Sequence, residues 1–315
     1  MDSEGLGVGV QERRSLHRVI ITMQMTDSQT IGKRPSASTW ICGRYTISLD
    51  HPRIMGILNV TPDSFSDGGQ WLDPEIAVRR GLELVAEGAD ILDSGGESTR
   101  PGAAAVPVDE ELRRVVPVID LLARQVSVPI SVDTRRCEVA QAALAAGATI
   151  VNDVSALGDP GMAVVVRAAG AGVVLMHCRG TPADMQRDPR YEDVVAEVRA
   201  FLAARMEAAI AAGIGRGQVV IDPGIGFGKT TAHNLALLGA LEKFAELAPV
   251  LVGASRKRFI GEITGAPKDG RLAGSLTVAI WSLMRGAAIL RVHDVAATRA
   301  AVRMAGALCG VSSEQ

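Results

Sequence analysis

Polar side chains end a series of short apolar runs in this chain, and their types suit hydrogen bonding to a flat, nitrogen-rich ring. The runs end at Asn59, Asp93, Asp133, Asp153, His177, Asp222, Ser255 and His293. Polarity alone ends many strands, but that explanation does not account for four carboxylates, one amide and two imidazoles at such positions. We therefore interpret the ends of these runs as a candidate ligand site.

Asp133, Asn152 and Asp222 are the candidates for reading the edge of a ring. Carboxylates and amides held in fixed geometry can pair with the amide and amino hydrogens of a pteridine or purine. Repulsion between buried carboxylates is costly unless ligand donors or a cation such as Lys257 offset it. The sequence shows no Ser-His-Asp or Cys-His set with suitable partners, which argues against covalent acyl chemistry.

Cationic and hydroxyl side chains cluster in three segments: GGESTRPGA at 95–103, GASRKRFIG at 253–261 and RVHDV at 291–295. Arg291 and His293 alternate along the chain and so share one face of a strand. A guanidinium such as that of Arg100 donates two parallel hydrogen bonds to paired oxygens. Cations converging from three segments of a slightly acidic chain predict a local oxyanion or phosphate site.

These side chains can act together only if the apolar runs lie side by side. The runs return about every thirty residues, the spacing of βα units. They are short and apolar on both faces, as buried parallel strands are. Eight such strands with helical patterns between them predict an α/β fold, the (β/α)8 TIM barrel, with its active site at the carboxyl ends of the strands. The alternation in TWICGRYTISLD predicts an N-terminal β-hairpin that closes the bottom of the barrel.

Helical patterns occupy the segments between the runs. They predict helices at 74–87, 109–125, 138–146, 160–169, 191–212, 232–246, 270–285 and 296–305. The predicted N-terminal capping residues are Asp73, Asp159 and Asp294. Glycines suited to left-handed C-caps follow the helices at Gly88, Gly147, Gly170, Gly213, Gly286 and Gly306.

Composition and charge narrow the class of protein. Residues 1–38 are polar and aperiodic, which predicts a disordered extension, followed by one domain at 39–310 and a tail at 311–315. The net charge of −2 argues against nucleic-acid and acidic-membrane partners. Four widely spaced Cys predict free thiols, and no apolar stretch reaches the roughly 18 residues of a membrane span. We therefore expect a cytoplasmic location.

Two segments that contain glycines indicate different structures. NVTPDSFSDGG, at 59–69, is long for a loop after a strand, and it is equally consistent with a loop that closes over substrate and with a solvated turn. DPGIGFGK, at 222–229, is not a phosphate loop, because G-x-x-x-x-G-K-[ST] would need Gly where Pro223 stands. Its glycines instead let a flat ligand approach the backbone.

Nine sequence blocks, in order and spacing, resemble the dihydropteroate synthase family. They are NVTPDSFSDGG, GGESTRPGA, SVDT, NDV, HCRGTPADMQ, DPGIGFGK, SRK, RLAGSL and RVHDV. The resemblance covers the chain from Trp40 to the last predicted helix. It implies a transferase of folate biosynthesis that condenses 6-hydroxymethyl-7,8-dihydropterin pyrophosphate with 4-aminobenzoate, giving 7,8-dihydropteroate and pyrophosphate.

The resemblance also implies roles for individual residues. Catalysis would depend on Asp133, Lys257 and Arg100. The pterin pyrophosphate would contact Thr99, Asp133, Asn152, Met176, Asp222, Phe227, Gly253, Lys257, Arg291 and His293. The 4-aminobenzoate would contact Phe65, Arg100, Pro101, Lys257 and Arg258. Asn59 would bind Mg²⁺, and the pyrophosphate would be held by Asn59, Arg100, Ser255, Arg291 and His293.

In the implied mechanism the leaving group departs before the arylamine attacks, and Asp133 stabilises the pterin cation. No dedicated nucleophile is then needed. The resemblance further implies a homodimer and competition by sulfonamides for the 4-aminobenzoate site.

Departures from the family pattern occur at Arg258, where a small hydroxyl residue is common, and at Ser94, Arg135 and Cys178. Two alternatives stay open. A pterin-binding methyltransferase would share the barrel but would need no cationic pyrophosphate site. A non-catalytic pterin-binding paralogue would show substitutions in the segments at 59–69 and 95–103, and both are intact.

Overall fold

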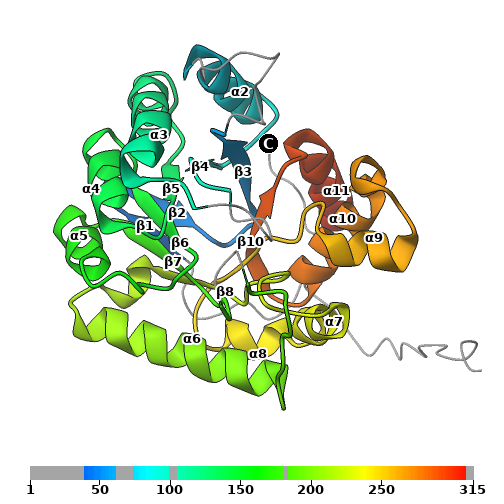
Figure 1. The fold of residues 1–315 in the computed structure, drawn as a ribbon. Coiled ribbons are helices and arrows are strands. Elements are labelled where there is room, and N and C mark those ends of the chain that lie inside the picture. The colour runs from blue at the N-terminus through cyan, green and yellow to red at the C-terminus, as the bar shows by residue number, and fades with distance from the viewer. Residues whose placement is uncertain (1–38, 62–73, 99–104, 181–183, 310–315) are drawn as a thin grey trace, which may run out of the picture.

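Each predicted apolar run forms a short parallel strand. The structure, a computed structural model, describes residues 39–61, 74–98, 105–180 and 184–309. In that part of the chain eight strands close into one barrel in the order β10-β3-β4-β5-β6-β7-β8-β9, and helices surround it (Figure 1). The predicted (β/α)8 barrel is confirmed. The extension at 1–38, the tail at 311–315 and the predicted cap Asp73 lie outside the described residues.

The strands are β1 (Thr39–Cys42), β2 (Tyr45–Ser48), β3 (Arg53–Asn59), β4 (Ile91–Gly95), β5 (Ile130–Asp133), β6 (Ile150–Asp153), β7 (Gly172–Met176), β8 (Val219–Asp222), β9 (Val250–Val252) and β10 (Ala287–Val292). Strands β4 to β9 are buried at every residue. One face of each strand lines the barrel interior and the other packs under helices, which explains why both faces are apolar in sequence.

The predicted run ends lie at or near the strand ends. Asn59, Asp133, Asp153 and Asp222 are the last residues of their strands. His177 and His293 directly follow strands, and Ser255 lies in the loop after β9. Asp93 differs, because β4 continues through Gly95 and leaves Asp93 inside the strand.

The outer layer consists of α2 (Pro74–Ala86), α3 (Val108–Ala123), α4 (Cys137–Ala145), α5 (Met162–Ala169), α6 (Val194–Ala211), α7 (Thr231–Gly239), α8 (Leu241–Ala245), α9 (Arg258–Thr264), α10 (Leu272–Met284) and α11 (Val295–Leu308), with 3-10 turns η1 (Arg216–Gln218) and η2 (Lys268–Gly270). The single helix predicted at 232–246 is wrong. Ala240, with φ −118° and ψ 20°, lies outside the α region and divides that segment into α7 and α8.

The capping predictions hold at five glycines and fail at Gly306, Asp159 and Asp294. Five of the predicted glycines have a positive φ: Gly88, Gly147, Gly170, Gly213 and Gly286. Gly306 was predicted to end its helix, but α11 continues through it. Asp294 stands before α11 without capping it, because its carboxylate accepts hydrogen bonds from Arg256 instead. Asp159 does not cap α5 either, because the N-cap of that helix is Gly161; the Asp159 carboxylate accepts the backbone N–H of Gly161 at 2.8 Å.

The N-terminal hairpin closes the bottom of the barrel, as predicted. Trp40 in β1 is fully buried, and its indole N–H donates to the backbone carbonyl of Gln218 at 2.8 Å. The hairpin lies against the start of β7, where a Cβ added to Gly172 would come within 2.5 Å of the Cys42 Sγ. The hairpin and the interior residues of the strands form one apolar cluster. A ligand must therefore enter from the opposite end.

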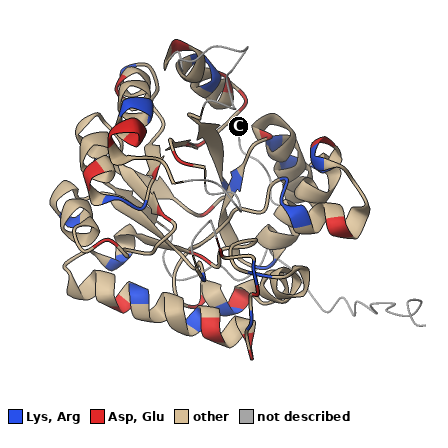
Figure 2. Cartoon of the chain, viewed as in Figure 1, with Lys and Arg blue, Asp and Glu red and all other residues tan. Residues whose placement is uncertain are grey.

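The outer surface carries charges of both signs. Figure 2 shows Lys and Arg interspersed with Asp and Glu along the helices in this view. Within the described residues, no helix combines the length and apolar character needed to cross a membrane.

Trp40→Ala should lower the free energy of unfolding by about 3–5 kcal/mol, because it removes a large buried side chain and leaves a cavity. Ile41→Ala is the matched control. Its side chain is 45% exposed, and its truncation should cost about 1 kcal/mol or less. Urea unfolding followed by circular dichroism measures both losses. Equal losses would show that the hairpin does not seal the barrel.

Candidate active site

Strand alternation determines which of the predicted residues face the barrel interior. Ile150, Val220 and Ile289 belong to the interior apolar cluster. Side chains two positions further along a strand point to the same side, so Asn152, Asp222 and Arg291 also face the interior, at its open end. Asp153 has the opposite parity. Its carboxylate accepts hydrogen bonds from Ser155 and Leu157 in its own loop, so it is not part of the site.

The acceptors predicted to read a ring lie on three strands, two of which are neighbours. Asp133 and Asn152 are Cα partners on β5 and β6, and Asp222 is the partner of Met176 on β8 and β7. All three acceptors are buried. Burial raises the pKa of Asp133, although the nearby Arg291 lowers it. Burial also raises the pKa of Asp222, opposed chiefly by the charge of Lys257.

Arg291 is the centre of the charged network. Its Nε donates to Asp93 Oδ2 at 2.6 Å, and its Nη2 donates to Asp133 Oδ2 at 2.7 Å. Burial alone would lower the pKa of the guanidinium, but the two carboxylates raise it. Asp93 was noted in the sequence only as the end of a run and was not predicted to belong to the site. The sequence feature that could have identified Asp93 is its position two residues after Ile91, which places both side chains on the interior face of β4.

The glycine-rich turn after β8 is shaped by close backbone contacts. Asp222 Oδ1 accepts the N–H of Gly224 at 2.7 Å. Gly224 has φ +69°, and an added Cβ would lie 1.9 Å from the carbonyl oxygen of His177. Only glycine fits there. At Gly226, with φ +82°, an added Cβ would lie 2.8 Å from the Lys257 Cδ. The turn therefore brings Lys257 against the backbone.

Lys257 joins this turn to the acceptors. Its Nζ donates to the carbonyl of Ile225 and lies 4.2 Å from the centroid of the Phe227 ring. This placement combines an ammonium with an aromatic face. Burial lowers the pKa of Lys257 to about 8, while Asp222 opposes that shift. Gly253 lies between the two charged groups, since an added Cβ would be 3.8 Å from Arg291 and 3.9 Å from Asp222.

Another lysine, Lys229, is buried and has no predicted role. Lys229 Nζ lies 2.9 Å from His177 Nδ1 and donates to the carbonyls of Phe227, at 2.9 Å, and of His177, at 3.3 Å. Burial lowers the pKa of Lys229 to about 7 and that of His177 to about 3. This pair ties the loop after β7 to the loop after β8. Sequence spacing gives no direct signal for such a contact.

Two contacts join the loops after β9 and β10. Ser255 Oγ accepts the N–H of His293 at 3.3 Å and lies 3.1 Å from its Nδ1. One residue further along each loop, Arg256 pairs with Asp294 through two hydrogen bonds. Arg256 has φ 59°, a conformation that is strained for a residue with a side chain. The paired loops hold a hydroxyl and an imidazole beside each other.

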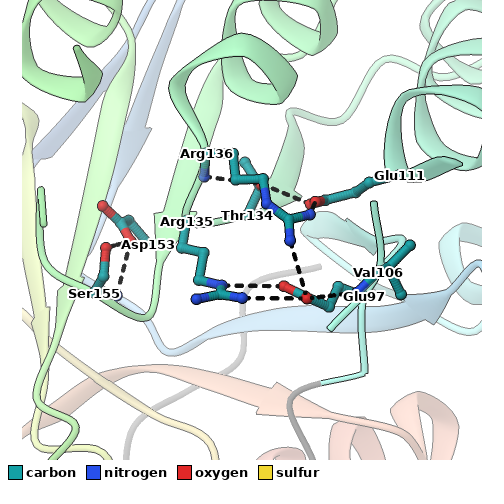
Figure 3. Close-up of polar contacts among 8 residues, drawn as sticks. All are labelled: Glu97, Val106, Glu111, Thr134, Arg135, Arg136, Asp153 and Ser155. Atoms are coloured by element: carbon teal, nitrogen blue, oxygen red, sulfur yellow. Dashed lines mark hydrogen bonds and ion pairs between the residues drawn. The ribbon is translucent and has the colours of Figure 1, made fainter. Parts of the chain in front are cut away.

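Ion pairs also link the loops after β4 and β5 (Figure 3). Glu97 accepts the N–H of Val106 at 3.0 Å and the Nε of Arg135 at 3.2 Å. Fully buried Glu111 accepts the hydroxyl of Thr134 at 2.7 Å and pairs with Arg136. Arg135, which departs from the family pattern, therefore forms an ion pair with Glu97.

The remaining predicted site residues differ in burial, and some lie outside the described part of the chain. Asn59 is half-buried at the end of β3, and Met176 is buried at the end of β7. Arg258 is exposed at the start of α9 and pairs with Glu262 at 3.0 Å. Four predicted contacts lie outside the described residues: Phe65, Thr99, Arg100 and Pro101. The four Cys are free thiols.

Comparison with known proteins agrees with this geometry. The family model described as "Pterin binding enzyme" matches residues 55–293. The dihydropteroate synthase of Mycobacterium leprae (strain TN) is 51% identical over 270 residues, covering 83% of this chain and 95% of that protein.

Solved structures give the same result. The Xanthomonas albilineans dihydropteroate synthase with 4-aminobenzoic acid has a TM-score of 0.83 and 53% identity, covering 88% of this chain and 100% of that one. The Xanthomonas albilineans enzyme in complex with 7,8-dihydropteroate has a TM-score of 0.79 and 50% identity, covering 87% and 100%. This chain therefore belongs to the dihydropteroate synthase family of pterin-binding enzymes.

Proposed function

We propose that this chain condenses 6-hydroxymethyl-7,8-dihydropterin pyrophosphate with 4-aminobenzoate. The bond between the pterin methylene carbon and the pyrophosphate oxygen breaks, and pyrophosphate leaves with the electron pair. The arylamine nitrogen then bonds to the methylene carbon and releases a proton, giving 7,8-dihydropteroate. The observation that carries this proposal is Arg291, a half-buried cation that pairs with both Asp93 and Asp133 near the open end of the barrel.

Three acceptors bind the pterin. Asp133, Asn152 and Asp222 present oxygens to the ring and amino hydrogens, and Lys257 donates to a ring acceptor. Met176 and Phe227 pack against the ring faces. The lack of a side chain at Gly253 keeps the space beside Asp222 and Arg291 narrow but open, which supports a flat ligand there.

The leaving pyrophosphate is bound by Arg291, Ser255 and His293. Groups that bind charge developing as the bond breaks stabilise the transition state more than the ground state. The methylene carbon meanwhile gains positive charge, and the carboxylate of Asp133 stabilises it. Arg100 also acts on the pyrophosphate and closes over the reacting groups in this proposal.

Mg²⁺ is the cofactor that we propose, with the amide oxygen of Asn59 as its protein ligand. Mg²⁺ prefers oxygen ligands and is commonly bound by one or two protein groups together with substrate phosphates. Asn59 fits this pattern, since it ends β3, the neighbour of the strand that carries Arg291. A bound Mg²⁺ would add positive charge opposite the pyrophosphate.

The 4-aminobenzoate binds among Phe65, Pro101, Lys257 and Arg258, with its carboxylate near the start of α9. Sulfonamides compete for this position. In the described residues Arg258 pairs with Glu262, and both side chains are exposed. An exposed pair is weak, so Arg258 can exchange Glu262 for the carboxylate of the substrate at little cost.

The methyltransferase alternative is not favoured. A folate-to-corrinoid methyl transfer has no anionic leaving group for Ser255, Arg291 and His293 to bind, and the matched relatives are dihydropteroate synthases.

We also propose a cytoplasmic location, which the free thiols support.

The decisive assay measures pyrophosphate release by the purified chain with Mg²⁺. Release should require both 6-hydroxymethyl-7,8-dihydropterin pyrophosphate and 4-aminobenzoate. Release that is independent of the arylamine would indicate a hydrolase. No release with both substrates would reject the proposed function.

Asp133→Asn should lower kcat by about 100- to 1,000-fold, because the carboxylate acts on charge that forms only in the transition state. Affinity for the pterin pyrophosphate should fall by less than about 10-fold, since the amide keeps one acceptor. Steady-state and single-turnover kinetics separate the two effects. Equal losses in kcat and affinity would assign Asp133 to ground-state binding alone.

The charge of Lys257 should set the alkaline limit of activity. The ammonium is present below its pKa of about 8 and is lost as the pH rises through that value. The kcat/KM of the free enzyme should therefore fall above about pH 8. Lys257→Arg keeps its charge at all working pH values, so its alkaline limb should vanish even if its activity is lower. An unchanged limb in this variant would assign the titration to another group.

We propose that the chain forms a homodimer through its outer helices. The faces of α10 and α11 expose the apolar side chains Leu272, Met284, Met304 and Leu308. Light scattering after gel filtration should give twice the mass of the chain. Met304→Glu together with Leu308→Glu should shift the protein to monomer. A wild-type monomer would contradict the proposal.

A further inference from the structure

Asp93 lies beneath the proposed pterin site and contacts no substrate in the function proposed above. It is fully buried, and its Oδ2 accepts two hydrogen bonds, from Arg291 Nε at 2.6 Å and from Asn152 Nδ2 at 3.1 Å. The other oxygen, Oδ1, is buried without a hydrogen-bond partner among the described residues. Burying a carboxylate oxygen without a hydrogen-bond partner lowers the stability of the fold, so such a group often has a functional role.

The position of Asp93 follows from the strand register. Gly95, two residues further along β4, is the Cα partner of Asp133 on β5. Asp93 therefore points into the barrel one interior layer below Asp133. From this layer it reaches side chains on two other strands, β6 and β10.

The contact with Asn152 fixes the orientation of an amide. Asp93 Oδ2 accepts the hydrogen bond from Asn152 Nδ2, so the amide turns its NH₂ group toward Asp93. The carbonyl oxygen of Asn152 then points away from Asp93 and is available as an acceptor for a ligand. Together with Asp133 and Asp222, it makes an edge of acceptors that selects a ring with N–H and NH₂ donors.

The contact with Arg291 fixes a guanidinium in the same way. Nε is committed to Asp93 and one hydrogen of Nη2 to Asp133. A guanidinium has five N–H donors in a rigid plane. The donors that remain can bind an anion only in the direction that this double attachment imposes.

We propose that Asp93 is a positioning residue that makes Asn152 a pterin acceptor and aligns Arg291 with the leaving group. This inference rests on the proposed function and deepens it, because it explains why the ring must present donors. Asp93 touches no substrate atom in this account; it acts through Asn152 and Arg291.

The test measures binding of 6-hydroxymethyl-7,8-dihydropterin, which lacks the pyrophosphate, by isothermal titration calorimetry. In Asp93→Asn the new amide can donate to Asn152, whose NH₂ group then turns toward the donors of the pterin. Affinity should fall by about 10- to 100-fold, the cost of an unmatched buried donor. A loss of less than threefold would overturn the proposal.

A reciprocal exchange distinguishes positioning from a structural role. In the double variant Asp93→Asn with Asn152→Asp, the amide at position 93 donates to the carboxylate at position 152, and an acceptor again faces the pterin. Affinity should return to within about fivefold of wild type and exceed that of Asn152→Asp alone. No recovery relative to Asn152→Asp would overturn the proposal, even if Asp93→Asn by itself failed to fold.

Asp153→Asn is the matched control. It makes the same change in another fully buried Asp, which bonds only to its own loop in the described contacts. It should lower the melting temperature and leave pterin affinity unchanged. Wild-type protein that fails to bind the pterin would reject the proposed function, whereas wild-type binding with an unaffected Asp93→Asn rejects only the role of Asp93.

Discussion

The guanidinium of Arg291, shared between Asp93 and Asp133, is the interaction on which the site depends. A buried charge is stable only when it is paired and hydrogen-bonded. Here one cation satisfies two carboxylates that would otherwise repel each other. It also joins β10 to β4 and β5, strands that carry different parts of the proposed chemistry. Loss of Arg291 would leave two buried carboxylates without their shared cation.

The barrel makes this convergence possible. Parallel strands bring all carboxyl ends to one opening, and alternation sends every second side chain to the interior. The hairpin with buried Trp40 seals the other end. Contacts between neighbouring loops, such as Lys229 with His177 and Arg256 with Asp294, then limit how far the site residues can move.

Sequence alone predicts the strands, their order and the placement of Asp133, Asn152 and Asp222 at strand ends, because parity and spacing are local properties. It fails where long-range pairing decides the outcome. The carboxylate of Asp294 bonds Arg256 rather than capping its helix. Lys229 and His177 meet across 52 positions. Asp93 was assigned to a strand end, yet β4 continues two residues further and places it beneath the site. These contacts and the end of β4 depend on parts of the chain that are far apart in the sequence, so no local pattern predicts them.

A crystal structure of this chain with 6-hydroxymethyl-7,8-dihydropterin and inorganic pyrophosphate is the sharpest test of the proposed site. We predict that the ring lies against Asp133, Asn152 and Asp222, with the carbonyl oxygen of Asn152 toward a ring donor. The pyrophosphate should contact Arg291, Ser255 and His293. A pterin bound elsewhere, or bound there with Arg291 turned away from both Asp93 and the pyrophosphate, would contradict the account.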